Sequence, residues 1–283
     1  MDESGSLQEI VCCIGHPVAG NPSQFILERA FAALGLEWRY LTLDVTPEQL
    51  ADAVRGMRAM GFRGSSIQLP HRVAVVPLVD RLGEAAEMTG SVSCIVREGD
   101  EFVGENTDGP AFLAALRESL DPAGKKFVVL GAGGLARAAA FAAAQAGAAE
   151  ITIVSRTESH GRALAESLVQ RLQISASYSA WEGDFAVPEG IDVLVNATSV
   201  GRADATARVP LDVDSLQQSM LVADLVVNPP QTRLLRDAAH RGCRTMHGLG
   251  MFVNQCTANF KLWSGLDADP AVMREALEEY LEF

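Results

Sequence analysis

The chain has 283 residues, of which 48% are hydrophobic and 21% are charged, and its formal net charge is -13. This length allows one or two domains with a large core, and the composition is typical of a globular protein. The acidic charge argues against nucleic acid or an anionic membrane as a partner, because such partners are repelled by an acidic surface. A small anionic ligand stays possible, since one local arginine could hold it.

The other bulk features indicate a cytoplasmic protein. The amino-terminal segment MDESGSLQE is acidic and polar, unlike a signal peptide, and no segment is long and apolar enough to span a bilayer. The five cysteines form no CxxC pair, so we expect reduced, mostly buried thiols. No metal site is expected, because the histidines are scattered as well.

The first hundred residues alternate between extended and helical patterns. We expect strands at 10–14, 38–45 and 64–69, helices at 24–34 and 47–60, and a hairpin at 92–97 and 101–103. Thr46 is the expected N-cap of the second helix, and Gly61 is its expected stop. This alternation predicts an α/β domain whose sheet is mostly parallel with an antiparallel edge.

A second α/β unit is expected beyond a boundary near residues 108–121. We expect strands at 127–130, 151–154, 193–196 and 221–226, and helices at 134–146, 250–263 and 271–281. The first of these strands is apolar throughout, as a parallel strand buried on both faces should be. Asp269 is the expected cap of the last helix, with Pro270 in its first turn.

A glycine-rich turn joins the first strand of this unit to its first helix. It reads Gly131-Ala132-Gly133-Gly134-Leu135-Ala136, which fits G-x-G-x-x-G/A in the strand–turn–helix context that this dinucleotide-binding pattern requires. Gly131 permits the tight turn, Gly133 lets the backbone approach a pyrophosphate, and Ala136 lets helix and strand pack closely. A glycine-rich turn without a ligand is the alternative, and the complete βαβ unit argues against it.

The end of the next strand favours NADP over NAD. An NAD site places Asp or Glu about 20 residues beyond the glycines, whereas this chain has Ser155-Arg156-Thr157 there. An arginine attracts a 2′-phosphate, and two hydroxyl groups can add hydrogen bonds. A solvated surface arginine is the alternative for Arg156, and Glu158 argues against a strong preference for NADP.

Seven segments follow one another in a characteristic order. They are IGHPVAGNPSQF, ENTDG, VLGAGGLARAA, SRT, NATSVG, NPPQTRLL and GLGMFVNQCTANFKLWSG. Together they resemble the shikimate dehydrogenase family, which includes shikimate/quinate dehydrogenases, over about residues 11–265. The resemblance implies a substrate-binding and catalytic domain of residues 1–108, completed by about 244–283, and a Rossmann-type dinucleotide-binding domain of residues 109–243. It also implies NADP-dependent reduction of 3-dehydroshikimate to shikimate, in chorismate and aromatic amino acid biosynthesis.

The resemblance also implies roles for single residues. Asp108 matches the family's catalytic aspartate, and Gln255 matches a glutamine that binds substrate hydroxyls. Ser23 matches the second of two serines that hold the substrate carboxylate, and Asn21 replaces the first. Cofactor contacts are implied for Thr198, Leu225 and Gly248, besides the glycine loop and Ser155 to Thr157.

Other substrate positions depart from the family, above all in the stretch SSIQLPHR. It corresponds to the family's N-V-T-x-P-x-K, so that Ser66 replaces the asparagine, Gln68 replaces the threonine and Arg72 replaces the catalytic lysine. Ser93 stands in place of a substrate-binding asparagine, and Val227 in place of a tyrosine near the carboxylate. The cofactor motifs therefore match the family, while about half of the substrate contacts have changed.

A guanidinium group has a pKa above about 12 and therefore stays protonated, so Arg72 cannot act as the base that a lysine could be. It can stabilise negative charge on a substrate oxygen, or hold a carboxylate through two hydrogen bonds. Proton transfer then falls to Asp108 or His71, directly or through a water. For His71 we favour a structural or solvated role, and for Asp108 the alternative is an N-cap of the following helix.

Three functional hypotheses follow. The first is an NADP-dependent shikimate dehydrogenase with a rebuilt substrate site, and the second is a related dehydrogenase for quinate or another cyclic hydroxy acid. The third is a catalytically weak protein that binds NADP or a metabolite, which the intact cofactor motifs disfavour. We expect a monomer or homodimer that binds a small-molecule substrate and NADP, and neither nucleic acid nor a membrane.

Overall fold

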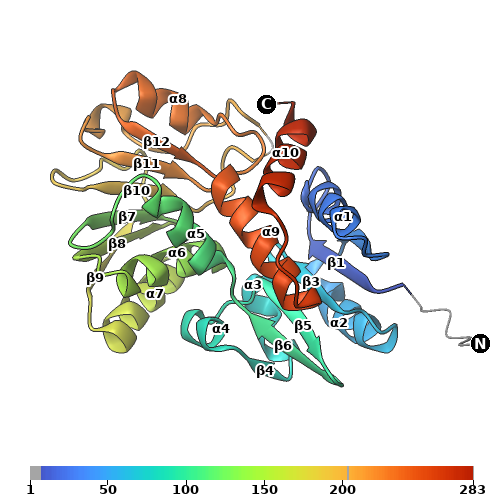
Figure 1. The fold of residues 1–283 in the computed structure, drawn as a ribbon. Coiled ribbons are helices and arrows are strands. Elements are labelled where there is room, and N and C mark those ends of the chain that lie inside the picture. The colour runs from blue at the N-terminus through green and yellow to red at the C-terminus, as the bar shows by residue number, and fades with distance from the viewer. Residues whose placement is uncertain (1–7, 203, 283) are drawn as a thin grey trace, which may run out of the picture. The chain divides into compact units, whose positions relative to one another are not determined.

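The computed structural model describes residues 8–202 and 204–282, which form two compact units (Figure 1). Among the described residues, the first unit comprises 8–107 and 256–282, and the second lies within Asp108–Gln255. Each unit contains its own six-stranded sheet. Helix α9 (Leu249–Ser264) contains the point at which the chain returns from the second unit to the first.

The sheet of the first unit has the strand order β2-β1-β3-β5-β6-β4. Its strands are β1 (Ile10–Gly15), β2 (Arg39–Asp44), β3 (Gly64–Ile67), β4 (Arg81–Leu82), β5 (Cys94–Glu98) and β6 (Glu101–Glu105). β1 runs parallel to β2 and β3, whereas β5 is antiparallel to β3 and β6. The predicted hairpin is present, but it lies inside the sheet rather than at its edge. The edge is β4, which pairs parallel with β6 and is too short to give a strand pattern in the sequence.

The helices of the first unit are α1 (Ser23–Ala33), α2 (Leu50–Ala59), α3 (His71–Ala74), α4 (Glu84–Thr89) and α10 (Pro270–Leu281), with 3-10 turns at Pro47–Gln49 and Val76–Leu78. Three of them, α1, α2 and α10, follow the prediction with small shifts, whereas the short helices α3 and α4 were not predicted. The helix expected at 47–60 is thus a 3-10 turn followed by α2, and the Thr46 side chain forms no capping hydrogen bond. The cap of α10 is confirmed, since Asp269 accepts a 2.8 Å hydrogen bond from the Ala271 amide.

Gly64 in β3 leaves no room for a side chain. Trp263 of α9 is buried over this position, and its indole Nε1 donates a 3.0 Å hydrogen bond to the Ile95 carbonyl oxygen. A Cβ atom at Gly64 would lie 2.2 Å from that oxygen and 2.5 Å from the indole nitrogen. The glycine therefore allows the carboxyl-terminal part of α9 to close over the sheet of the first unit.

Replacing Gly64 with alanine is expected to destabilise the protein by about 3 kcal/mol, because the carbonyl group or the indole must move. Thermal and urea unfolding would measure the loss. Gly56→Ala is the matched control, since it adds the same methyl group to α2, where the Met60 methyl group lies 3.7 Å away. That variant should be neutral or more stable by up to about 1 kcal/mol. Equal stability of the two variants would contradict the packing described at Gly64.

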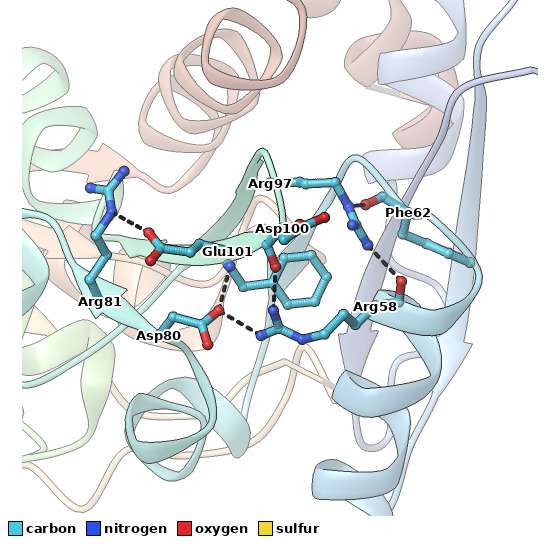
Figure 2. A network of polar contacts seen from close by, with 8 residues as sticks. Arg58, Phe62, Asp80, Arg81, Arg97, Asp100 and Glu101 are labelled. Carbon is cyan, nitrogen blue, oxygen red and sulfur yellow. Dashed lines mark hydrogen bonds and ion pairs between the residues drawn. The ribbon is translucent and has the colours of Figure 1, made fainter.

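A network of arginines and a carboxylate connects α2 to the β5–β6 hairpin (Figure 2). Asp80 accepts 2.6 Å hydrogen bonds from the Phe102 amide and from Arg58. Arg58 also donates to the Asp100 carbonyl at 2.6 Å, and Arg97 donates to the Arg58 carbonyl at 2.7 Å. The guanidinium carbons of these two arginines lie 4.6 and 5.0 Å from the centre of the Phe102 ring. The network stabilises the hairpin on the side of the unit that α2 covers.

Asp80→Asn is expected to lower the melting temperature at pH 7 by about 1–3 °C, a small effect because Asp80 and Arg58 are partly exposed to screening solvent. The hydrogen bond from the Phe102 amide, followed by the one from Arg58, holds the pKa of Asp80 below its ordinary value of 3.8. The stabilisation is therefore present above the ordinary pKa and is lost as the pH falls through the lowered one. The difference in melting temperature between the variant and the wild type should therefore be smaller at about pH 2 than at neutral pH, which thermal unfolding at the two pH values would measure. Asp52→Asn, which removes an exposed partner of Arg55, is the control, and an equal effect there would refute a special role of Asp80.

The sheet of the second unit is entirely parallel, with the order β12-β11-β10-β7-β8-β9. Its strands are β7 (Lys126–Leu130), β8 (Glu150–Ser155), β9 (Ser175–Ala180), β10 (Val193–Asn196), β11 (Leu221–Asp224) and β12 (Arg244–His247). Numbered within the unit, this is the order 3-2-1-4-5-6 of the Rossmann fold. The predicted fold class is confirmed. The order reverses between β7 and β10, and ligands of this fold bind at the carboxyl ends of the strands at such a point.

The helices of the second unit connect these strands. They are α5 (Asp108–Arg117), α6 (Gly134–Gln145), α7 (Glu158–Leu172) and α8 (Arg233–His240), with a 3-10 turn at Val213–Ser215. The region expected to be a domain boundary is therefore mostly the helix α5, which packs against α6. A Cβ atom at Gly109 of α5 would lie 3.3 Å from the Ala138 carbonyl oxygen of α6, so the two helices approach closely.

Candidate functional site

The glycine loop lies between β7 and α6 and has the shape of a phosphate cradle. Gly131 has φ +109, which a residue with a side chain rarely adopts, and a Cβ atom there would lie 3.2 Å from the Ala197 carbonyl oxygen. Gly133 is the N-cap of α6, and a Cβ atom there would meet nothing within 4 Å, so the backbone is open to a ligand. Ala136 is buried, which permits the close packing of α6. The amide groups of the first turn of α6 can thus receive a pyrophosphate.

The end of β8 carries the residues expected to select the dinucleotide. Ser155 is buried, and its hydroxyl group donates a 2.9 Å hydrogen bond to the Thr157 carbonyl oxygen. Arg156 and Thr157 are exposed. The Ser155 proton is therefore used within the protein, while the Arg156 guanidinium and the Thr157 hydroxyl are accessible to a 2′-phosphate.

The other expected cofactor positions lie at the carboxyl ends of β10, β11 and β12. Thr198 follows β10, and its Cγ2 would be 3.3 Å from a Cβ atom at Gly131. Leu225 follows β11 and is buried. Gly248 follows β12, where a Cβ atom would lie 2.7 Å from the Val226 carbonyl oxygen. These positions and the glycine loop thus border one edge of the second sheet.

Arg72 is held by the strand that precedes it. It lies on α3 and is only 5% exposed, and its Nε donates a 3.0 Å hydrogen bond to the Ile67 carbonyl oxygen. Its Nη2 lies 3.5 Å from Oε1 of Gln68, which is 9% exposed. Within residues 8–202 and 204–282, the buried Gln68 Nε2 has no hydrogen-bond partner. A buried amide donor without an acceptor is costly, so the pair is suited to a ligand oxygen.

His71 has the structural role that was favoured for it. The side chain is fully buried, and its Nε2 lies 2.7 Å from the Val45 carbonyl oxygen. A carbonyl oxygen only accepts, so Nε2 carries the hydrogen that joins the two. The imidazole therefore connects the start of α3 to the end of β2.

Two of the expected substrate positions belong to a buried hydrogen-bond network within the first unit. Ser93 Oγ lies 3.0 Å from Thr107 Oγ1 and accepts a 2.8 Å hydrogen bond from the Thr107 amide. Thr107 Oγ1 donates at 2.7 Å to Asn259 Oδ1, and Asn259 Nδ2 donates at 3.1 Å to Ser66 Oγ. Asn259 was not predicted from the sequence, because an asparagine inside a helix has no pattern that indicates a site. Much of the hydrogen-bonding capacity of Ser66 and Ser93 is thus used inside the protein.

The remaining substrate positions, apart from Val227, are also polar and mostly buried. Asp108 opens α5, is fully buried, and accepts a 2.5 Å hydrogen bond at Oδ1 from Gln255 Nε2, so the two expected partners meet. Ser23 is 2% exposed, and its amide donates a 2.8 Å hydrogen bond to Asn21 Oδ1. Val227 follows β11 and is half-buried, with no polar side-chain atom to offer a carboxylate.

The described ranges contain no group of three His, Cys, Asp or Glu side chains that could hold a metal ion. All five cysteines are buried thiols that are not in disulfides, as expected from the sequence. Burial raises the pKa of the Cys12 and Cys256 thiols to about 12, so these thiols stay protonated and unreactive. No helix of the described residues is both long and apolar enough to cross a membrane.

Comparison with known proteins decides the family. The shikimate dehydrogenase substrate binding domain matches residues 13–95, the shikimate / quinate 5-dehydrogenase family matches 114–229, and the shikimate 5′-dehydrogenase C-terminal domain matches 248–278. A shikimate dehydrogenase (NADP(+)) of Methanopyrus kandleri is 42% identical over 277 residues, which are 96% of each chain. The chain belongs to the shikimate dehydrogenase family. The resemblance drawn from the seven sequence segments is confirmed.

Solved structures of the shikimate dehydrogenase family and its relatives share the fold. A ligand-free 5-ketofructose reductase from a Gluconobacter strain has a TM-score of 0.86 and 42% identity, covering 97% of this chain and 99% of that one. A shikimate 5-dehydrogenase of Thermus thermophilus, in complex with NADP(H) and shikimate, has a TM-score of 0.84 and 34% identity, covering 97% and 100%. Relatives of similar closeness thus carry two different named activities.

Sequence reasoning within this family missed three buried polar residues of the second unit. Asn196 ends β10, Asp224 ends β11, and Thr232 is the N-cap of α8. Asp224 accepts hydrogen bonds from both of the others, at 3.0 Å and 2.7 Å. The signal that could have found them is a polar residue closing an apolar strand, which occurs at both Asn196 and Asp224.

Proposed function

We propose that the protein is an NADP-dependent shikimate dehydrogenase, which interconverts 3-dehydroshikimate and shikimate. The observation that carries the proposal lies in the second unit. Asp108, bound to Gln255, stands at the start of α5, and α5 packs directly on α6, the helix that the dinucleotide loop opens. A buried carboxyl group is thereby built into the same unit as an intact dinucleotide loop, as hydride transfer coupled to proton transfer requires.

The second unit supplies the groups that would hold NADP(H). The glycine loop and the first turn of α6 would bind the pyrophosphate, and Arg156 with Thr157 would bind the 2′-phosphate. The geometry fits the group, because Gly131 adopts the φ of +109 that the tight turn needs and Gly133 leaves the backbone open to a ligand. When bound, NADPH supplies the hydride that reduces the substrate carbonyl carbon.

Proton transfer is assigned to Asp108. During reduction the carbonyl oxygen gains negative charge and needs a proton, which the protonated carboxyl group of Asp108 would give, and during oxidation the carboxylate would take it back. Gln255 orients the carboxyl group through the 2.5 Å hydrogen bond to Oδ1. The amide cannot exchange the proton itself, so it leaves the acid–base role to Asp108.

The first unit supplies the groups that would bind the substrate. Arg72 and Gln68 Nε2 are hydrogen-bond donors, and neither can act as a base at neutral pH. We assign them to a substrate oxygen that accepts hydrogen bonds, with Arg72 stabilising the negative charge that develops during the reaction. Ser23 and Asn21 would hold the far end of the substrate. The first unit is accordingly the substrate unit, and the second is the cofactor unit.

A second candidate is the reduction of an uncharged polyhydroxy ketone. The observation that favours it is the 42% identity to a solved structure named 5-ketofructose reductase. The residues agree with such a substrate, because half-buried Val227 has no donor for a carboxylate while Gln68 and Arg72 add donors for carbonyl or hydroxyl oxygens. Quinate or another cyclic hydroxy acid stays the third possibility.

The two candidates are separated by initial rates with NADPH and NADH on 3-dehydroshikimate and 5-ketofructose, and with NADP⁺ and NAD⁺ on shikimate and quinate. The proposal predicts that the 3-dehydroshikimate and shikimate pair has the highest kcat/KM, with a preference for NADP(H). A kcat/KM for 5-ketofructose at least about 100-fold above that for 3-dehydroshikimate would replace it with the second candidate. Binding of NADPH without turnover of any of the four substrates would overturn both.

The cysteines and the proposed cofactor bear on the cellular compartment of the enzyme. Five buried cysteines that are not in disulfides fit a reducing compartment, and with the use of NADP(H) they support a place in the cytoplasm. The substrate domain is proposed as residues 1–108 with about 244–283, and the cofactor domain as 109–243. The compact units divide at Thr107 and Asp108, and again at Gln255 and Cys256. A monomer or homodimer stays a prediction.

A further inference from the structure

A line of buried polar side chains joins the loops that leave β10 and β11. Asn196 and Asp224 end these strands and lie opposite each other in parallel register. The carboxylate of Asp224 accepts hydrogen bonds from Asn196 Nδ2 at 3.0 Å, from the Val226 amide at 3.1 Å and from Thr232 Oγ1 at 2.7 Å. Asn196 and Asp224 are fully buried, and Thr232 is 1% exposed. A carboxyl group so placed connects both loops and the start of α8.

The same line continues to the glycine loop through Thr198. Asn196 Oδ1 accepts hydrogen bonds from the Thr198 amide at 3.2 Å and from its hydroxyl group at 2.7 Å. A carboxylate only accepts, so the Asn196 nitrogen must face Asp224 and the Asn196 oxygen must face Thr198. Thr198 in turn lies against Gly131, where a Cβ atom would be 3.3 Å from its methyl group. The amide of Asn196 therefore lies in a chain of contacts that runs from Asp224 to the dinucleotide loop.

We propose that Asp224 is a positioning residue for the cofactor. Its ionised carboxyl group orients Asn196, Asn196 holds Thr198 against the glycine loop, and NADP(H) binds more tightly when Asp224 is ionised than when it is protonated. The inference rests on the proposed binding of NADP(H) at this loop, and it goes beyond it by adding a residue that acts only through others. Asp224 takes no part in the chemical step.

Asp224 changes charge within the working range of an enzyme. Burial raises its pKa from 3.8 to about 6, although the hydrogen bonds from Thr232, Val226 and Asn196 lower it. Protonation removes the charge from the hydrogen bond with Asn196, and a neutral hydrogen bond is roughly half as strong as a charge-assisted one.

The groups that face Asp224 from the neighbouring elements are few. β12 presents His247, an ionisable residue that lies opposite Asp224 in register. β10 presents the uncharged Asn196. In the first turn of α8, Arg233 lies 3.5 Å from Asp237 in an ion pair of its own. A pH effect must therefore be assigned between Asp224 and His247 by substitution.

The experiment measures the Kd of NADPH by its fluorescence from about pH 5 to 8, with kcat at saturating cofactor as a second readout. In the wild type we expect binding to weaken about fivefold as the pH falls through the range where Asp224 gains its proton, because a charge-assisted hydrogen bond then becomes a weaker neutral one. Asp224→Asn copies the protonated form, since its amide can donate to Thr232 while its oxygen still accepts from Asn196 and Val226. It should bind about fivefold more weakly at pH 8, with kcat within a factor of two.

The 2′-phosphate of NADPH itself titrates near pH 6, so the effect of Asp224 is read as the difference between the pH profiles of the wild type and Asp224→Asn.

Two substitutions at Thr232 keep the test valid if Asp224→Asn does not fold. Thr232→Val removes a donor to the ionised carboxyl group, so the midpoint of the wild-type pH effect should move upward, whereas Thr232→Ser keeps the donor and the midpoint. His247→Gln should leave the Asp224-dependent difference in place. A folded Asp224→Asn variant with the wild-type Kd and pH profile, or an unchanged midpoint in Thr232→Val, would overturn the inference alone. A wild type that binds no NADPH at any pH would overturn the proposed function and the inference together.

Discussion

Asp108→Asn is expected to lower kcat about 1000-fold in both directions of the proposed reaction, which is the typical contribution of a positioned general acid–base group. Asparagine has the same shape, and its side-chain oxygen can still accept the hydrogen bond from Gln255 Nε2, so the fold of the site should persist. What is lost is the exchangeable proton. The loss should therefore appear in kcat, with the Kd of NADPH within a factor of two of the wild type.

Single-turnover measurements of NADPH oxidation would check this prediction, because they report the chemical step apart from product release. Asp121→Asn is the control, since Asp121 is an exposed aspartate of the same unit whose carboxylate accepts a local hydrogen bond from the Ala123 amide. A variant at Asp108 that keeps more than about a tenth of the wild-type rate would move the proton-transfer role to another group. A loss of rate that comes with a lowered melting temperature would not support the assignment, so thermal unfolding is measured beside it.

Arg72→Met is expected to lower kcat/KM about 100-fold, because it removes a buried cation assigned to the substrate oxygen while keeping most of the apolar stem. Arg72→Lys should recover only part of the loss. Lysine keeps the charge, but it cannot hold both the Ile67 carbonyl and the Gln68 side chain in the planar geometry of a guanidinium group. Initial rates with the best substrate found for the wild type would measure both variants.

The pH profile of kcat/KM distinguishes a fixed cation from a proton-transfer group at this position. A guanidinium group does not exchange its proton with a substrate, so the wild-type profile should show no limb from this position, whereas the Arg72→Lys variant introduces an amine that can titrate when buried. Arg39→Met, on the exposed edge strand β2, is the control for loss of an arginine as such. Full activity of the folded Arg72→Met variant on every substrate tested would remove Arg72 from the substrate site.

The candidate site combines positions that sequence could locate with contacts that it could not. The glycine loop was located because its spacing and the flanking apolar strand are local features of the chain, and the structure places Gly131 in the required left-handed conformation. Asp108 and Gln255 were found only through the family resemblance, since a lone Asp and a lone Gln 147 residues apart have no local pattern. In the structure the two side chains form a direct hydrogen bond, while their roles stay predictions.

The parts that sequence reasoning missed are contacts between distant segments. Asn259 bonds to Thr107 and Ser66, which precede it by 152 and 193 residues. The sequence alone could not show that Ser66 and Ser93 form hydrogen bonds within such a network. The short strand β4 and the short helices α3 and α4 were missed for a related reason, since segments of two to six residues hold too few periods of any pattern.

By itself the sequence determined the class of fold, the dinucleotide loop and the family, because apolar periodicity, glycine spacing and ordered motifs are properties of the chain read along its length. The tertiary structure alone decided which polar groups are satisfied within the protein and which are left for a ligand. His71 and Arg72 are neighbours in the chain, yet one is bound to the Val45 carbonyl and the other lies beside a Gln68 amide donor that has no hydrogen-bond partner among the described residues. Hydrogen bonding is decided by distance and direction between atoms, and only the folded chain brings those atoms together.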